Sequence, residues 1–306
     1  MKKIVSFALA LLCVLSAGAQ DVYHFATRDT LDLHLSVFEA TPGSETTFQG
    51  QEKPVILFVV GGGFVRMELG DYVYDWFDIL NDNGYTVVSI EYRQGMKGYK
   101  VGKGLVGLAK ASNQFLLSQE MAVEDLFSAV QFLIDNREEI GLNPDNLVLV
   151  GSSAGAITVL AAEYEIVRGR MGGLPEGFNF RGVMSFAGGI ISTSGAPRYP
   201  SAPCPTMLLH GTADGAVAYK HTGVFGRGLW GSDYLARQLD RLDADYCIYR
   251  YPGRTHDVAG YMQAAWPLEK EFLEKSVILQ AHRVIDATIV DASMPSWGNI
   301  TMDDIY

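Results

Sequence analysis

Residues 147–155, LVLVGSSAG, decide the fold. The apolar run Leu147–Gly151 predicts a strand buried on both faces, and Ala154–Val167 continues as a helix. The turn between them matches G-x-S-x-G, in which a sharp strand-to-helix turn lifts a serine hydroxyl above the sheet and small neighbours let the backbone come close. We therefore predict Ser153 as a nucleophile; the alternative is a tight turn that merely contains a serine.

Strands and helices alternate on both sides of this motif. Such alternation predicts an α/β fold with a mostly parallel sheet and helices on both faces. The predicted strands are 55–60, 85–92, 147–151, 183–187, 206–210 and 245–251, and the predicted helices are 71–83, 120–136, 154–167, 232–244 and 258–277.

The chain before the first parallel strand follows another pattern. Over Tyr23–Phe38 apolar and polar residues alternate, which predicts an antiparallel hairpin with one buried face. We expect a single domain over residues 20–306. Residues 94–119 are rich in glycine and lysine and are predicted as a long loop that could cover the site. Residues 281–306 are predicted as a C-terminal tail without an assigned role.

The N-terminus carries a targeting pattern. Lys2 and Lys3 precede an apolar run over Ile4–Leu15, and Ala17-Gly18-Ala19 follows with small residues. This order predicts a signal peptide over residues 1–19, because the run is shorter than the ~20 residues that a membrane span requires. We expect an exported protein, periplasmic or secreted.

Charge and cysteine content narrow the partners. The formal net charge is −11, and no basic stripe is present, so we expect neither a nucleic-acid partner nor attraction to a membrane surface after signal cleavage. Export would permit a disulfide between Cys204 and Cys247, but we predict two buried free thiols. No metal-ligand cluster or dinucleotide fingerprint appears, so no cofactor is predicted.

A second glycine-rich motif, Gly61-Gly62-Gly63, ends an earlier buried strand. Consecutive glycines let backbone N–H groups turn inward without side chains in the way. The amides of Gly62 and Gly63, together with that of Ala154, are predicted to form an oxyanion hole. A flexible turn is the alternative.

The remaining candidates lie at the ends of two later strands. Asp214 follows the strand 206–210 and is predicted to orient the histidine, with loop capping as the alternative. His256 follows the strand 245–251 and is predicted as the general base, which gives the chain order serine, acid, histidine. Asp257 is a weaker choice for the acid, and His210 is predicted to brace the acid's loop.

Taken together, these motifs resemble α/β-hydrolases of the carboxylesterase and hormone-sensitive-lipase-like type, including bacterial carbohydrate esterases. The resemblance runs from about Val55 to His256 and includes the segments 91–93 (EYR) and 122–125 (AVED). Two positions depart from the family pattern: Val60 stands where histidine is usual, and Ser152 where aspartate is frequent. The short interval between nucleophile and acid leaves no room for a large cap.

The resemblance implies two-step acyl transfer through an acyl-enzyme. The expected substrates are short-chain or carbohydrate-linked esters, acetyl or feruloyl. Four aromatic residues near the loops are expected to serve mostly as packing, with stacking on a substrate ring as the alternative: Tyr99, Phe115, Tyr219 and Trp230. A serine peptidase of the same fold and a non-catalytic binding protein remain as other functions.

Overall fold

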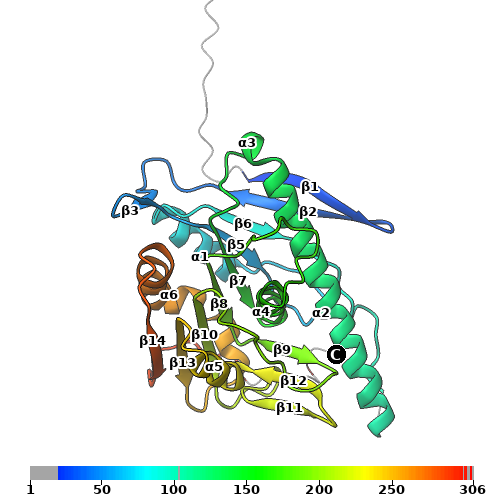
Figure 1. Ribbon diagram of the computed structural model, residues 1–306. Coiled ribbons are helices and arrows are strands. Elements are labelled where there is room, and N and C mark those ends of the chain that lie inside the picture. The colour runs from blue at the N-terminus through cyan, green and yellow to red at the C-terminus, as the bar shows by residue number, and fades with distance from the viewer. Residues whose placement is uncertain (1–19, 103, 299, 302–303, 305–306) are drawn as a thin grey trace, which may run out of the picture.

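A computed structural model describes residues 20–102, 104–298, 300–301 and 304, and a nine-stranded sheet forms its centre (Figure 1). The predicted signal peptide lies outside the described residues. In sheet order the strands are β1 (Asp21–Arg28), β2 (Leu31–Phe38), β6 (Val87–Ile90), β5 (Val55–Val59), β7 (Leu147–Ser152), β8 (Gly182–Phe186), β10 (Thr206–Gly211), β13 (Tyr246–Tyr251) and β14 (Val284–Thr288).

The predicted fold class is confirmed. β1 pairs with β2 and β2 with β6 in antiparallel fashion, and every pair from β6 to β14 is parallel. The hairpin behaves as its alternation predicts, because Leu33, Leu35 and Val37 are buried while their neighbours are at least partly exposed. The parallel strands β5, β7, β8 and β10 are buried along their whole length, as apolar runs covered on both faces should be.

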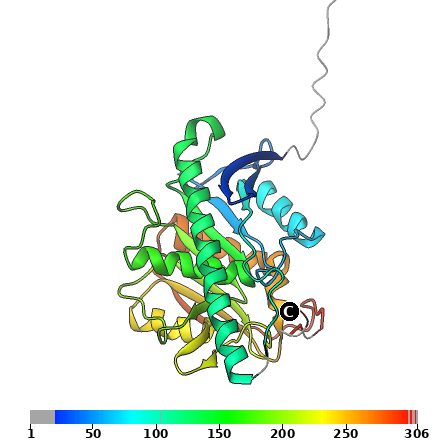
Figure 2. The same ribbon diagram turned by 90° about the vertical axis from the view of Figure 1, so that its right-hand side faces the viewer.

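Helices cover both faces of the sheet. α2 packs against α4 on one face, and α1 packs against α6 on the other (Figures 1 and 2). Among the described residues, no helix combines the length and apolar character needed to cross a membrane. The helices are α1 (Asp71–Asp82), α2 (Gly104–Asp135), α3 (Arg137–Ile140), α4 (Ala154–Val167), α5 (Ser232–Arg241) and α6 (Met262–Phe272), with the 3-10 turn η1 (His256–Gly260) and the π-turn η2 (Leu273–Ile278).

The predicted loop over 94–119 is wrong for residues 104–119, which form the first half of the 32-residue helix α2. This half extends past the sheet (Figure 1) and is held partly by polar side chains. Gln114 donates to a backbone carbonyl at 2.6 Å, and Gln119 bonds the backbone of Ile191 through both its amide atoms. Polar anchoring leaves only a weak apolar period, so the sequence pattern gave no helix signal.

The predicted helix 258–277 is also corrected. It is divided into η1, α6 and η2, and α6 contains Pro267. Proline lacks the N–H that continues an α-helical ladder, and the widened π-turn begins six residues later, at Leu273. The apolar pattern alone does not record these changes of helical pitch.

Three parts of the architecture lie outside the sequence prediction. β9 (Gly189–Ser192), β12 (Arg227–Gly231) and β11 (His221–Val224) form a separate three-stranded sheet, and β3 (Thr47–Phe48) pairs with β4 (Gln51–Glu52). The tail predicted over 281–306 supplies β14, which adds a parallel strand to β13 at the sheet edge.

Cys204 and Cys247 are both buried and free, as predicted.

Candidate active site

The turn between β7 and α4 holds Ser153 in a strained conformation. Its φ is 52° and its ψ −116°, and its N–H donates to the Phe186 carbonyl at 2.9 Å. Both flanking glycines are sterically required. A Cβ on Gly151 would lie 2.3 Å from the Gly155 oxygen, and a Cβ on Gly155 would lie 1.9 Å from the Val59 oxygen. The G-x-S-x-G spacing therefore follows from close backbone packing at this turn.

Three predicted residues from distant parts of the chain meet here in hydrogen-bonding order. Ser153 Oγ lies 2.8 Å from His256 Nε2, and His256 Nδ1 lies 2.8 Å from Asp214 Oδ2. Both Ser153 and His256 are buried but not fully sealed, with 8% and 5% of their surface exposed. With a carboxylate accepting from Nδ1, the Nε2 atom carries a lone pair and can accept a proton from the serine.

The Asp214 carboxylate is buried and accepts several hydrogen bonds. Its Oδ1 accepts the backbone N–H groups of Ala216 and Val217, both at 2.9 Å. Its Oδ2 faces His256 and, at 3.3 Å, His210. Burial by itself would raise the pKa of Asp214, but hydrogen bonds from His210 and His256 outweigh it and hold the pKa below its usual value. The group therefore stays ionised beside the imidazole.

His210 braces this loop, as predicted. Its Nε2 faces two acceptors, the Val217 carbonyl at 3.0 Å and the Asp214 carboxylate, so this nitrogen carries the proton. Its Nδ1 then accepts from the Ser232 hydroxyl at 2.8 Å. The ring is fully buried, and its partners hold both the ring and the loop of the acid in place.

The loops that carry the acid and the histidine are bonded to each other. The N–H of Thr212 donates to the Tyr251 carbonyl and that of Ala213 to the Arg254 carbonyl, both at 3.0 Å. A Cβ on Gly211 would lie 2.3 Å from the Arg254 oxygen, so glycine permits this approach. Ser152, on the nucleophile turn, also binds the histidine segment, since its hydroxyl donates to the Ala259 carbonyl at 2.6 Å. At the position where aspartate is frequent, this chain uses serine to bind the histidine segment.

The predicted glycine loop lies against the nucleophile turn. A Cβ on Gly61 would lie 2.9 Å from the Ser152 oxygen and 3.1 Å from Ser153 Cβ. Gly62 and Gly63 have φ values of 122° and 65°, a region that side-chain-bearing residues rarely adopt. Ala154 is the first residue of α4, where backbone N–H groups lack intrahelical acceptors. The three predicted oxyanion-hole residues thus lie on the two segments that meet at Ser153.

Asp257, which we considered as an alternative to Asp214 for the orienting acid, bonds the C-terminal tail instead. One oxygen accepts the Trp297 N–H at 3.0 Å, and the other accepts the Ser296 hydroxyl at 3.2 Å. Asp257 therefore anchors the C-terminal tail beside His256.

A cleft of about 630 Å³ opens above Ser153. The glycine loop, the start of α1, η1 and the C-terminal tail all contribute to its lining. Its described lining residues are Val60, Gly61, Gly62, Gly63, Val65, Arg66, Glu68, Gly70, Tyr72, Ser152, Ser153, His256, Asp257, Ala259, Gly260, Trp297, Ile300 and Asp304.

The cleft corrects two expectations about its surroundings. No described residue of 94–119 lines it, whereas the tail supplies Trp297, Ile300 and Asp304. Sequence reasoning missed these residues because no strand or motif marks their return to the site; the isolated tryptophan in a polar tail was the available signal. The four aromatic residues named earlier pack against the core or are buried instead, and none lines this cleft: Tyr99, Phe115, Tyr219 and Trp230.

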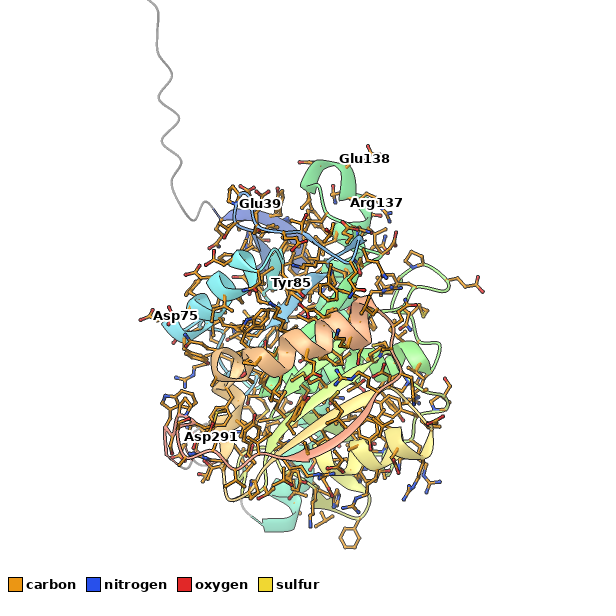
Figure 3. The ribbon with its side chains drawn as sticks, turned by 90° about the vertical axis from the view of Figure 1, so that its left-hand side faces the viewer. Glu39, Asp75, Tyr85, Arg137, Glu138 and Asp291 are labelled. Atoms are coloured by element: carbon orange, nitrogen blue, oxygen red, sulfur yellow. The ribbon has the colours of Figure 1, made fainter. Side chains whose placement is uncertain are left out.

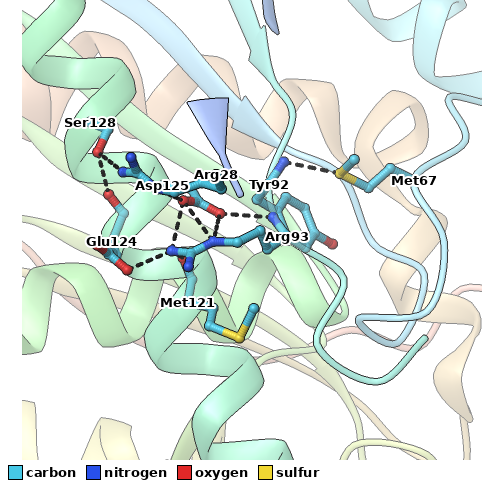
Figure 4. A network of polar contacts seen from close by, with 8 residues as sticks. All are labelled: Arg28, Met67, Tyr92, Arg93, Met121, Glu124, Asp125 and Ser128. Atoms are coloured by element: carbon cyan, nitrogen blue, oxygen red, sulfur yellow. Dashed lines mark hydrogen bonds and ion pairs between the residues drawn. The ribbon is translucent and has the colours of Figure 1, made fainter. Parts of the chain in front are cut away.

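From the segments 91–93 and 122–125, Arg93, Glu124 and Asp125 form an ion-pair cluster with Arg28 (Figure 4). Asp125 is fully buried and accepts from the N–H and guanidinium of Arg93 and from Arg28 on β1. Hydrogen bonds to Asp125 and Glu124 hold the pKa of Arg93 above its usual value even though burial opposes this. The neighbouring Tyr92 hydroxyl donates to the Val60 carbonyl at 2.8 Å, which ties the cluster to the glycine loop.

Across the part of the chain that the structure describes, no group of three or more His, Cys, Asp or Glu side chains is arranged to hold a metal ion.

Comparisons with known proteins agree with this geometry. Residues 28–163 match the model of the Carboxylesterase family. Acetylcholinesterase from Gallus gallus is 35% identical over 109 residues, which are 35% of this chain and 13% of that protein. Esterase B1 from Culex pipiens is 28% identical over 145 residues, or 45% of this chain and 24% of that protein. The matched segment therefore spans less than a quarter of these curated relatives.

Solved structures extend the likeness to the second half of the chain. Esterase 2 from Thermogutta terrifontis, in a form phosphoramylated by tabun, superposes with a TM-score of 0.59 at 17% identity. The alignment covers 83% of this chain and 93% of that one. At this identity the likeness establishes the shared fold.

Proposed function

We propose that this chain, which has the α/β-hydrolase fold and whose residues 28–163 match the model of the Carboxylesterase family, is a serine carboxylic ester hydrolase. Ser153 is the nucleophile, His256 the general base and Asp214 the acid that orients it. The observation that carries this proposal is the hydrogen-bonded chain of these three side chains at the base of an open cleft.

The first half of the reaction forms an acyl-enzyme. His256 Nε2 takes the proton from Ser153 Oγ as this oxygen attacks the ester carbonyl. The imidazolium that results is stabilised by ionised Asp214, whose buried carboxylate already accepts from Nδ1. The tetrahedral intermediate collapses when His256 returns the proton to the leaving alcohol, and water then repeats the sequence on the acyl group.

Backbone amides stabilise the charge that develops on the carbonyl oxygen. The amides of Gly62, Gly63 and Ala154 are assigned this role because their segments meet beside Ser153. A single donor of this kind contributes about 3 kcal/mol in well-studied hydrolases. The assignment is supported by the positive φ of both glycines, which turns the backbone where a side chain would be strained.

For the substrate, we propose short-chain or carbohydrate-linked esters, acetyl or feruloyl. An open cleft that holds both aromatic and carboxylate side chains supports esters of polar alcohols. The apolar N-terminal run supports export, which would bring the enzyme to extracellular esters. N-terminal sequencing of protein recovered outside the cytoplasm would test export; a mature chain that retains residues 1–19 would contradict it.

A substrate panel separates this function from its alternatives. The purified protein is assayed on p-nitrophenyl acetate, on acetylated xylan and on peptide amides, beside the Ser153→Ala variant. We expect ester turnover that the variant lacks. Turnover of peptide amides at a comparable rate would favour a peptidase, and the absence of any turnover would favour a binding protein.

A further inference from the structure

The C-terminal strap, defined as residues 289–298 and 300–301, is fastened to the segment that carries His256. Arg254 donates to the carbonyls of Asp291 and Met294 at 3.1 and 3.2 Å. The Thr255 hydroxyl donates to the Gly298 carbonyl at 3.2 Å, and Asp257 accepts from the strap as described above. The strap is therefore held by residues on both sides of His256, and Figure 3 shows Asp291, near the start of the strap, beyond the end of β14.

This anchoring fixes an aromatic pair at the rim of the cleft. The rings of Trp297, on the strap, and Tyr72, on α1, have centroids 6.4 Å apart and planes inclined by 39°. Trp297 is 53% exposed and Tyr72 43% exposed, although both residues belong to the lining of the cleft. Large aromatic residues so exposed beside a catalytic serine form a surface for a ligand.

Each ring lies on a glycine, which fixes its height above the backbone. A Cβ on Gly260 would lie 2.9 Å from the Trp297 ring, and a Cβ on Gly70 would lie 2.9 Å from the Tyr72 ring. Trp297 also contacts the fully buried Tyr261 ring at 6.1 Å between centroids. One side of each ring thus packs on the backbone, while about half of the surface of each residue remains exposed.

Carboxylates lie on the same walls. Glu68 precedes α1 and Asp304 follows the strap, and both line the cleft together with Arg66. Asp304 Oδ2 accepts the N–H and hydroxyl of Thr301. A pyranose ring presents an apolar C–H face and a rim of hydroxyl donors, so aromatic rings flanked by carboxylates match both of its parts. A planar aryl group would use only the rings.

We propose that Tyr72 and Trp297 form a platform that binds a pyranose ring of an acylated carbohydrate while its ester is held at Ser153. The platform would select carbohydrate esters over small alkyl esters of the same acyl group. This inference rests on the proposed ester hydrolase function.

The test compares two acetyl esters on the same protein. We measure kcat/KM for acetylated xylo-oligosaccharides and for ethyl acetate, and take their ratio. Trp297→Ala should lower this ratio about tenfold, the effect of losing roughly 1.4 kcal/mol of ring contact. Trp297→Phe should restore part of it. Because both esters share the acyl group and the catalytic residues, a change in the ratio reports the alcohol side alone.

A matched control and a second variant separate binding from stability. Tyr74, two positions along α1 from Tyr72, is 40% exposed but packs on Phe38 and Phe77 outside the cleft, so Tyr74→Ala should leave the ratio unchanged. Gly260→Ala should lift the Trp297 ring from below and lower the ratio in the same direction as Trp297→Ala.

The outcomes are distinguishable from a failure of the hydrolase function. If the wild-type protein turns over neither ester, the hydrolase proposal itself fails. If it turns over both and Trp297→Ala lowers both rates equally, the strap is only structural and the platform is refuted. Methyl ferulate serves as a third substrate. If Trp297→Ala lowers the preference for methyl ferulate over ethyl acetate but leaves the preference for the acetylated oligosaccharide unchanged, the platform binds aryl groups and the sugar assignment is wrong.

Discussion

At the scale of single residues, the site depends on a carboxylate that is kept ionised while buried. Burial would raise the pKa of Asp214, but hydrogen bonds and charge interactions with His210 and His256 hold it below the usual value, and two backbone N–H groups also bond the carboxylate. The same contacts leave the side chain one orientation, with Oδ2 toward His256. Asp214 therefore stabilises the charged form of His256 and fixes the tautomer of its neutral form.

Removing the charge of Asp214 should lower kcat more than removing the charge of Asp257. Asp214→Asn should reduce kcat by about three to four orders of magnitude, because an amide can no longer stabilise the imidazolium or fix its tautomer. Asp257→Asn should lose far less, since Asp257 bonds the strap instead of the histidine ring. Steady-state kinetics on p-nitrophenyl acetate would show this difference. Equal losses in the two variants would reassign the acid.

The residues that bear the chemistry could be predicted because each ends a strand. Ser153, Asp214 and His256 follow buried runs whose carboxyl ends meet at one edge of a parallel sheet, so their approach follows from topology. Trp297 could not be predicted, because its return to the cleft depends on hydrogen bonds that Arg254 donates to the tail and that Asp257 accepts from it. Such bonds leave no periodic trace in a sequence.

At the scale of elements, a buried ion cluster joins α2 to the hairpin and to the end of β6. Arg28 reaches Asp125 from β1 and Arg93 reaches it after β6, while α2 supplies the acid (Figure 4). Polar contacts of this kind also explain why α2 could be predicted only over 120–136. There an apolar face packs on α4 and the sheet, whereas residues 104–119 depend on polar contacts that periodicity does not reveal.

Breaking this cluster should destabilise the fold. Asp125→Asn should lower the free energy of unfolding by about 3–5 kcal/mol, because Arg28 and Arg93 lose the one fully buried carboxylate that pairs with both. Glu124→Gln is the control, since Glu124 also binds Arg93 but is largely exposed and should cost at most about 1 kcal/mol. Urea denaturation measures both values. Similar losses would show that burial does not govern this pair.

At the scale of the whole molecule, the core carries a carboxyl group that opposes folding at neutral pH. Glu163 on α4 is buried, with one oxygen accepting the Cys204 N–H and the other unbonded among the described residues. Burial raises the pKa of Glu163 to about 7, from an ordinary value of 4.5. Between these values the unfolded chain ionises first, so stability falls as the pH rises from 4.5 to 7 and then levels off.

Replacing that group should remove this loss. Glu163→Gln keeps an acceptor for Cys204 and should be more stable than the wild type at pH 8 by up to about 3 kcal/mol, with little difference at pH 4. Glu165→Gln on the same helix is the control, because Glu165 is paired with Arg168 at the surface. Thermal unfolding followed from pH 4 to 8 tests this. Parallel curves for the wild type and Glu163→Gln would contradict it.

The account as a whole depends on Ser153 being an activated nucleophile, and covalent labelling measures this directly. The purified protein is treated with a fluorophosphonate, digested and mapped by mass spectrometry, with His256→Ala as the comparison. We predict one adduct, on the peptide that contains Ser153, formed far more slowly when the imidazole is removed. No adduct, or an adduct on another residue at the same rate in both proteins, would contradict the account.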